Sequence, residues 1–121
     1  PTLENGEEHS ITGVFDNNAD TATLYIDGIE IGSRALDFDS STLDTLTIGK
    51  VGAWPQYFDG EIDNVQIHNT ALNTDEISTI ANGGVVTNGL LGHYDFEGDN
   101  PLADKSVNGN DATSYGNTHI V

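Results

Sequence analysis

The stretch from Phe58 to Ile77, FDGEIDNVQIHNTALNTDEI, carries the clearest structural signals of the chain. The Asp59-Gly60 pair is typical of a turn. The run from Ile62 to Ile67 then alternates apolar and polar residues, as a half-buried strand does. Asn73, followed three residues later by Glu76, is a helix start of the capping-box type. The stretch therefore predicts a turn, a strand, a polar bend and a helix, in that order.

Two strands and a hairpin are predicted before this stretch. Residues 9–15, HSITGVF, and residues 21–26, TATLYI, both show the alternation of strands. Asp27-Gly28 favours a two-residue hairpin turn of type I′, from which residues 29–31 lead back antiparallel. We interpret Asp27 as a turn residue and not as a ligand.

The remaining elements are one more strand and a short helix. Residues 43–48 predict a strand in which Leu46 and Ile48 face inward. Residues 74–81 predict a helix of about two turns, which Gly83 ends. Fourteen glycines and many turn-forming residues favour short strands joined by tight turns. The sequence thus predicts an all-β, antiparallel protein with one short helix.

These elements together resemble the laminin-G-like, or concanavalin A-like lectin, jelly-roll family. LYIDG at 24–28 is similar to a hairpin of that family, and residues 58–77 are similar to the end of its C-terminal half. Residues 89–113 resemble instead the beginning of such a domain. The matching positions are Gly89, Leu90, Leu91, Tyr94, Phe96, Gly98, Asp104, Ser106, Asn108, Gly109 and Asn110. The resemblance implies an antiparallel β-sandwich, in which Tyr94 and Phe96 share one strand face.

The two halves of the resemblance stand in inverted order. Residues 1–83 resemble the family's C-terminal half, residues 84–88 read as a linker, and residues 89–121 resemble its N-terminal strand and loop. The chain is either a piece across two tandem domains, a permuted domain, or half of a two-part assembly. We expect one β-sandwich over residues 1–121 in permuted order. Self-association or a complementary chain would supply the missing strands, because a half-sandwich leaves open edges.

The charge limits the classes of partner. Twenty acidic residues stand against three basic ones, for a net charge of −17, which excludes nucleic acid and anionic membrane surfaces. The acidity has two interpretations, solubility in a salty medium and compensation of carboxylates by bound calcium. The absence of cysteine excludes disulfides and thiolate metal sites. No signal peptide or transmembrane run is recognised, and we expect an extracellular location, secreted or at the surface of a bacterial cell.

Residues 95–111 are rich in the hard oxygen donors that calcium prefers. The resemblance implies a structural calcium site that joins this loop to the strand of Asp63. Asn64 stands where the family often has a second acid, which removes one charge from the site. The alternative is a set of solvated acidic loops without an ion. The predicted ligands are Asp63, Glu97, Asp104 and Asn108, followed by Asp95 and Asn110.

An aromatic loop is the candidate binding surface. Residues 50–57, KVGAWPQY, hold the only tryptophan, and Pro55 excludes a central strand there. Trp54 either folds back onto the core or, with Tyr57, offers a flat apolar face to a sugar ring.

Catalysis finds little support in the sequence. There is no GxSxG, no P-loop and no cysteine nucleophile, and the four histidines form no HExxH zinc motif. The family resemblance, together with the acidity and the aromatic loop, implies a non-catalytic extracellular carbohydrate-binding or adhesion module with structural calcium, whose partner is a glycan or an extracellular protein. One alternative is a calcium-stiffened spacer or protein-interaction domain of a large secreted repetitive protein. A more distant alternative is a fragment of a glycoside hydrolase with paired carboxylates.

Overall fold

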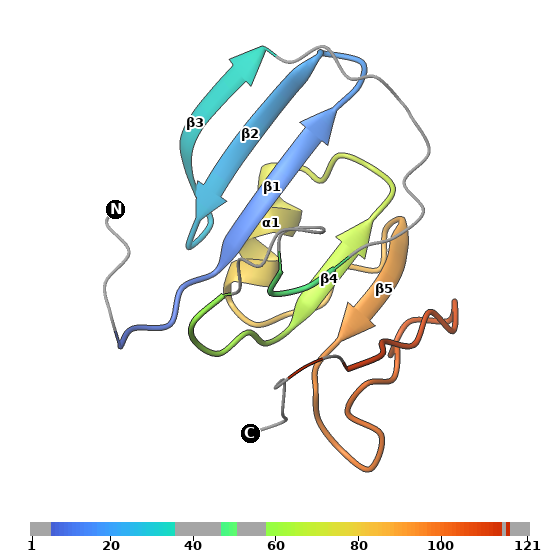
Figure 1. Ribbon diagram of the computed structural model, residues 1–121. Coiled ribbons are helices and arrows are strands. Elements are labelled where there is room, and N and C mark those ends of the chain that lie inside the picture. Colours follow the sequence, from blue (N-terminus) through green and yellow to red (C-terminus); the bar gives the residue numbers. More distant parts are fainter. Residues whose placement is uncertain (1–5, 36–46, 51–57, 115, 117–121) are drawn as a thin grey trace.

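The computed structural model describes residues 6–35, 47–50, 58–114 and 116 (Figure 1). Within these residues the strands form two antiparallel sheets, one of three strands in the order β1-β2-β3 and one of two strands, β4-β5. The predicted all-β sandwich class with one short helix is confirmed. The elements are β1 (Ile11–Asp16), β2 (Thr21–Ile26), β3 (Ile29–Ala35), β4 (Val65–His68), α1 (Thr74–Ala81) and β5 (Leu90–Tyr94).

The β1-β2-β3 sheet is a meander whose turns follow from local sequence. Asp27 and Gly28 both have left-handed backbones, with φ of 53° and 81°, as a type I′ turn requires. At the first turn, Asp16 Oδ1 accepts the amides of Asn18 at 2.9 Å and Ala19 at 3.2 Å. The predicted hairpin is confirmed, and its third strand is longer than residues 29–31.

Asp27 also ties the hairpin turn to the start of β1. Its Oδ2 lies 2.7 Å from His9 Nδ1, and its Oδ1 accepts the Ser10 amide at 2.9 Å. The Asp27 amide donates in turn to the Ser10 carbonyl at 2.8 Å. The hydrogen bond from His9 and then that from Ser10 hold the pKa of Asp27 below its ordinary value. Asp27 is therefore a turn residue, as predicted.

The second sheet joins two segments that lie far apart in the sequence. β4 pairs antiparallel with β5, with Val65 opposite Tyr94. Asn64 has φ of 50°, which is incompatible with a pleated strand, so β4 begins after it and not at Ile62. Phe96 has φ of 55°, so it does not continue the face of Tyr94 as predicted. Both corrections have the same cause, a left-handed residue at the end of a strand.

The segment at 84–88, predicted as a linker, is held against β4 by two side chains. Gln66 donates from Nε2 to the Gly84 carbonyl at 2.9 Å and accepts the Val86 amide at 3.2 Å. His68 Nε2 lies 2.8 Å from the Val86 carbonyl. The Val86 side chain is buried. This segment is thus part of the packed fold.

Helix α1 begins and ends as the sequence predicts. Asn73 Oδ1 accepts the Glu76 amide at 2.9 Å, and Glu76 Oε1 accepts the Asn73 amide at 3.1 Å, which completes the capping box. Gly83 has φ of 89° after the last turn, and the Gly84 amide donates to the Thr79 carbonyl at 2.9 Å. This is the Schellman arrangement. No helix within the described residues is long and apolar enough to span a membrane.

The buried hydrophobic side chains of the described residues come from both sheets, the helix and the 84–88 segment. They are Ile26 of β2, Ile77 of α1, Val86 of the 84–88 segment and Tyr94 of β5. Ile77 is completely buried. The helix therefore supplies the centre of this small core.

Ile48 is exposed, contrary to the prediction that it faces inward from a strand. It lies in a bend, and Thr47 Oγ1 donates to the Lys50 carbonyl at 2.8 Å, which closes a turn. A turn does not alternate its side chains between two faces, so the strand rule fails for Ile48. The rest of the predicted strand, including Leu46, lies outside the described residues apart from Thr47.

We expect Ile77→Ala to destabilise the protein by roughly 2–5 kcal/mol, because truncation of a buried side chain loses its transfer free energy and leaves a cavity. Val107→Ala is the matched control, since Val107 is fully exposed. It should change the free energy of unfolding by less than about 0.5 kcal/mol. Urea unfolding followed by circular dichroism measures both. Equal unfolding midpoints for Ile77→Ala and the wild type would contradict the central place of Ile77.

Candidate functional site

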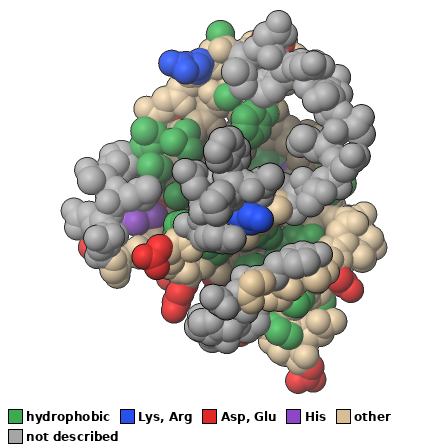
Figure 2. Space-filling model, in the orientation of Figure 1, with side chains coloured by type: hydrophobic (Ala, Val, Ile, Leu, Met, Phe, Trp, Pro, Cys, Tyr) green, Lys and Arg blue, Asp and Glu red, His purple; other side chains and the backbone are tan. Residues whose placement is uncertain are grey.

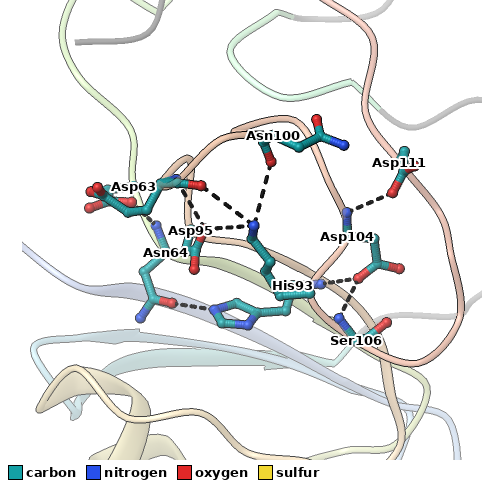
Figure 3. A network of polar contacts seen from close by, with 10 residues as sticks. Asp63, Asn64, His93, Asp95, Asn100, Asp104, Ser106 and Asp111 are labelled. Atoms are coloured by element: carbon teal, nitrogen blue, oxygen red, sulfur yellow. Dashed lines mark hydrogen bonds and ion pairs between the residues drawn. The ribbon is translucent and has the colours of Figure 1, made fainter.

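Asp104 is the buried charged side chain of the described residues, with 8% of its surface exposed. Its Oδ1 accepts the amides of His93 at 2.9 Å and Ser106 at 2.8 Å. Its Oδ2 accepts the amide of Asn110 at 2.9 Å. One carboxylate therefore joins strand β5 to two points of the loop that follows it (Figure 3).

The protonation of Asp104 reflects this environment. Burial by itself raises the pKa of a carboxyl group. The hydrogen bonds from the His93 amide, the Ser106 hydroxyl, the Asn110 amide and the Ser106 amide together outweigh it. They lower the pKa of Asp104 from 3.8 to about 2. Asp104 is thus a fixed negative charge at neutral pH, and backbone dipoles stabilise it.

The loop around Asp104 closes through further bonds. The Asp104 amide donates to Asp111 Oδ1 at 2.9 Å, and the Lys105 amide donates to the His93 carbonyl at 2.7 Å. Tyr94 Oη donates to the Asn110 carbonyl at 2.6 Å. Burial, and then the charges of Asp104 and Asp111, raise the pKa of the Tyr94 hydroxyl.

Asn108 and Asn110 use their side-chain nitrogens, whereas the sequence prediction assigned them an oxygen ligand role. Asn108 Nδ2 donates to the Leu90 carbonyl at 2.8 Å, and Asn110 Nδ2 donates to the Leu91 carbonyl at 2.9 Å. These bonds satisfy carbonyl groups of β5. The two amides therefore fasten the loop to the strand.

Asp63 and Asp95 lie in a second group, on the other side of His93 from Asp104 (Figure 3), and Glu97 belongs to it through its amide, which bonds to Asp95. Asp63 Oδ1 accepts the amide of Asn64 at 2.7 Å. Asn64 Oδ1 lies 2.9 Å from His93 Nε2. His93 thus connects the two groups, because its amide reaches Asp104 and its ring reaches Asn64. No sequence pattern indicates this role of His93.

The second group surrounds a cation that belongs to the chain itself. Lys105 Nζ lies 3.4 Å from the carbonyl oxygens of Glu97 and Asn100 and 4.0 Å from Asp95 Oδ1. Asp95 Oδ1 also accepts the Glu97 amide at 3.0 Å. Carbonyl and carboxylate oxygens are the donors that calcium uses. Here they face an ammonium group.

The six predicted calcium ligands do not converge on one point. Asp104, Asn108 and Asn110 are engaged with the backbone around β5, whereas Asp95 and Glu97 lie near Lys105. No group of three or more His, Asp or Glu side chains in the described part of the chain has an arrangement that suits a metal ion. The donor set thus fits calcium only in part, near Asp95, and calcium stays a prediction. Trp54 and Tyr57, the predicted sugar-binding residues, lie outside the described residues.

We expect Asp104→Asn to lower the free energy of unfolding by roughly 2–3 kcal/mol at neutral pH, because the amide replaces an acceptor of backbone N–H groups by a donor. The pKa of Asp104 is lowered on folding, so its contribution is present above pH 3.8 and is lost as the pH falls toward about 2. The difference from the wild type should shrink over that interval. Urea titrations at several pH values measure it, with the exposed Asp99→Asn as control. A difference that stays constant down to pH 2 would contradict the assigned role.

The architecture can be compared with that of known protein families. Two antiparallel sheets and one short helix are consistent with a β-sandwich of the concanavalin A-like class. The profile of the concanavalin A-like lectin/glucanases superfamily matches residues 1–78, and the chain belongs to that superfamily. Residues 89–121, which resemble its first strand and loop, lie outside the match.

A solved structure supports the same fold. The chain is similar to the crystal structure of an S-layer domain-containing protein, residues 221–444, from Clostridium thermocellum ATCC 27405, with 28% identity and a TM-score of 0.60. The match covers 67% of this chain and 42% of that one, so this chain spans less than half of the solved structure. A search of curated proteins found no match.

Proposed function

We propose that this chain is a non-catalytic module of an extracellular, cell-surface protein and that it binds a carbohydrate or an adhesion partner. The superfamily to which it belongs contains lectins and glucanases. The similar S-layer domain-containing protein supports a place at a bacterial cell surface. The strongly acidic composition, with a net charge of −17, agrees with a protein that works in a salty medium.

The state of Asp104 is the observation that carries the non-catalytic part of the proposal. A glycoside hydrolase needs one carboxyl group with a raised pKa, which donates a proton to the leaving group. Two described carboxyl groups have clearly shifted pKa values, Asp27 and Asp104, and both pKa values are lowered. Both groups accept hydrogen bonds that hold turns and loops. Their chemistry is structural.

A glycan array tests the binding proposal, with cell-wall polysaccharides of Gram-positive bacteria included. We expect binding that Trp54→Ala reduces roughly twofold to tenfold, because contact with an aromatic face contributes ~0.5–1.5 kcal/mol. Val107→Ala is the control, since Val107 is fully exposed and lies outside the aromatic loop. Failure to bind any glycan would overturn carbohydrate binding and favour the spacer.

The second candidate is a structural spacer that calcium stiffens. The closed bonding of the loop around Asp104 favours a structural role, because its side chains hold the loop against β5. Asp95 and the carbonyls of Glu97 and Asn100 would hold the ion, in competition with the Lys105 ammonium. Calcium would replace the single charge of the ammonium by a double positive charge at these oxygens. Both candidates include this structural calcium role.

Thermal unfolding with calcium or with a chelator tests that role. A ligand at a hundred times its dissociation constant adds about 2.7 kcal/mol to the free energy of unfolding. We expect a rise in Tm with calcium that is larger in Lys105→Ala than in the wild type, because the competing ammonium is gone. Asp95→Asn in the Lys105→Ala background should reduce it, and magnesium is the control ion. No specific calcium effect in either protein would rule out the site.

A further inference from the structure

One face of the β1-β2-β3 sheet is apolar and largely exposed, although Ile26, which pairs with Ile11 and Ile29 on that face, is buried. Residues that pair across antiparallel strands point to the same side of a sheet. The register places Phe15 opposite Ala22, Gly13 opposite Leu24, and Leu24 opposite Gly32. The large side chains of this apolar sheet face are Ile11, 60% exposed, Phe15, 63%, Leu24, 42%, Ile29, 60%, and Ile31, 41%.

The apolar sheet face is also hollowed. Phe15, Leu24 and Ile31 line a depression of about 400 Å³, together with small and polar residues of the same strands. Figure 2 shows hydrophobic side chains gathered over the part of the surface where this sheet lies. Exposed apolar patches of a few hundred Å² commonly mark interaction sites.

Most charged side chains of these strands lie on the opposite side of the sheet from the apolar sheet face. Asp16 follows the strand alternation onto the opposite side, and Glu30 pairs with Tyr25, also on that side. Arg34, opposite Ala22, is the charged residue of the described strands on the apolar side. Two such faces therefore meet without bringing these strand carboxylates together.

We propose that the apolar sheet face is a self-association surface, on which the same face of a second copy packs. Two twisted sheets stack face to face about 10 Å apart and bury their facing side chains. A pair of faces with five large apolar residues each buries on the order of 1,000 Å², which reaches the lower limit of a specific interface. The second copy thus covers apolar side chains that the described part of the chain leaves exposed.

The charge predicts how this association depends on salt. Two chains of net charge −17 repel each other over about a Debye length, which is ~10 Å at 0.1 M salt and ~3 Å at 1 M. The apolar contact itself is not weakened by screening. Association therefore strengthens as sodium chloride is added, whereas an interface held by ion pairs would weaken.

Sedimentation equilibrium of the purified chain tests the proposal. The expected mass rises from 12.9 kDa toward twice that value with increasing protein and salt. Phe15→Ser and Ile29→Ser, at positions exposed by 60% or more, should each raise the dissociation constant at least tenfold. Phe58→Ser is the matched aromatic control, because Phe58 is 59% exposed and lies outside the sheet. Circular dichroism verifies that each variant is folded.

Two results would overturn the proposal. One is a monomer at high protein concentration and high salt. The other is a dimer that the two sheet variants do not weaken, which would place the contact elsewhere, such as the edge of β3. The glycan test depends on Trp54 and not on these residues, so either proposal can fail while the other stands.

Discussion

A buried carboxylate needs partners, and this need organises the C-terminal part of the chain. Asp104 is surrounded by the amides of His93, Ser106 and Asn110, which come from a strand and from both limbs of a loop. An unpaired charge at this depth would cost several kcal/mol. The backbone can avoid that cost only by wrapping around the carboxylate. The carboxylate thus holds the loop against β5, which pairs in turn with β4.

Local sequence predicted the local structure well. Asp27-Gly28 and the Asn73–Glu76 pair each encode a geometry within a few residues, and both form as expected. The predicted roles of Asn108 and Asn110 depend on which atoms of a side chain meet which carbonyl. Spacing alone carries no such information. The ends of β4 and β5 were predicted wrongly because Asn64 and Phe96 adopt left-handed backbones that alternation does not reveal.

The acidic side chains and the apolar sheet face occupy different parts of the surface. Carboxylates gather in turns and in the loop after β5, where backbone amides or the Lys105 ammonium meet them. The face of the β1-β2-β3 sheet carries aliphatic and aromatic side chains instead. Long-range repulsion and short-range apolar attraction therefore act on different parts of the molecule. Ionic strength sets the balance between them.

The register of β4 and β5 determines how the fold responds to mechanical tension. Val65, at the start of β4, lies opposite Tyr94, at the end of β5. The chain enters and leaves this strand pair at the same end, so a pulling force opens the ladder one hydrogen bond at a time and does not shear it. The Asp104 clamp on His93 sits at that end and carries the load first. The hydrogen bond from the His93 amide to this carboxylate thus lies beside the open end of the strand pair.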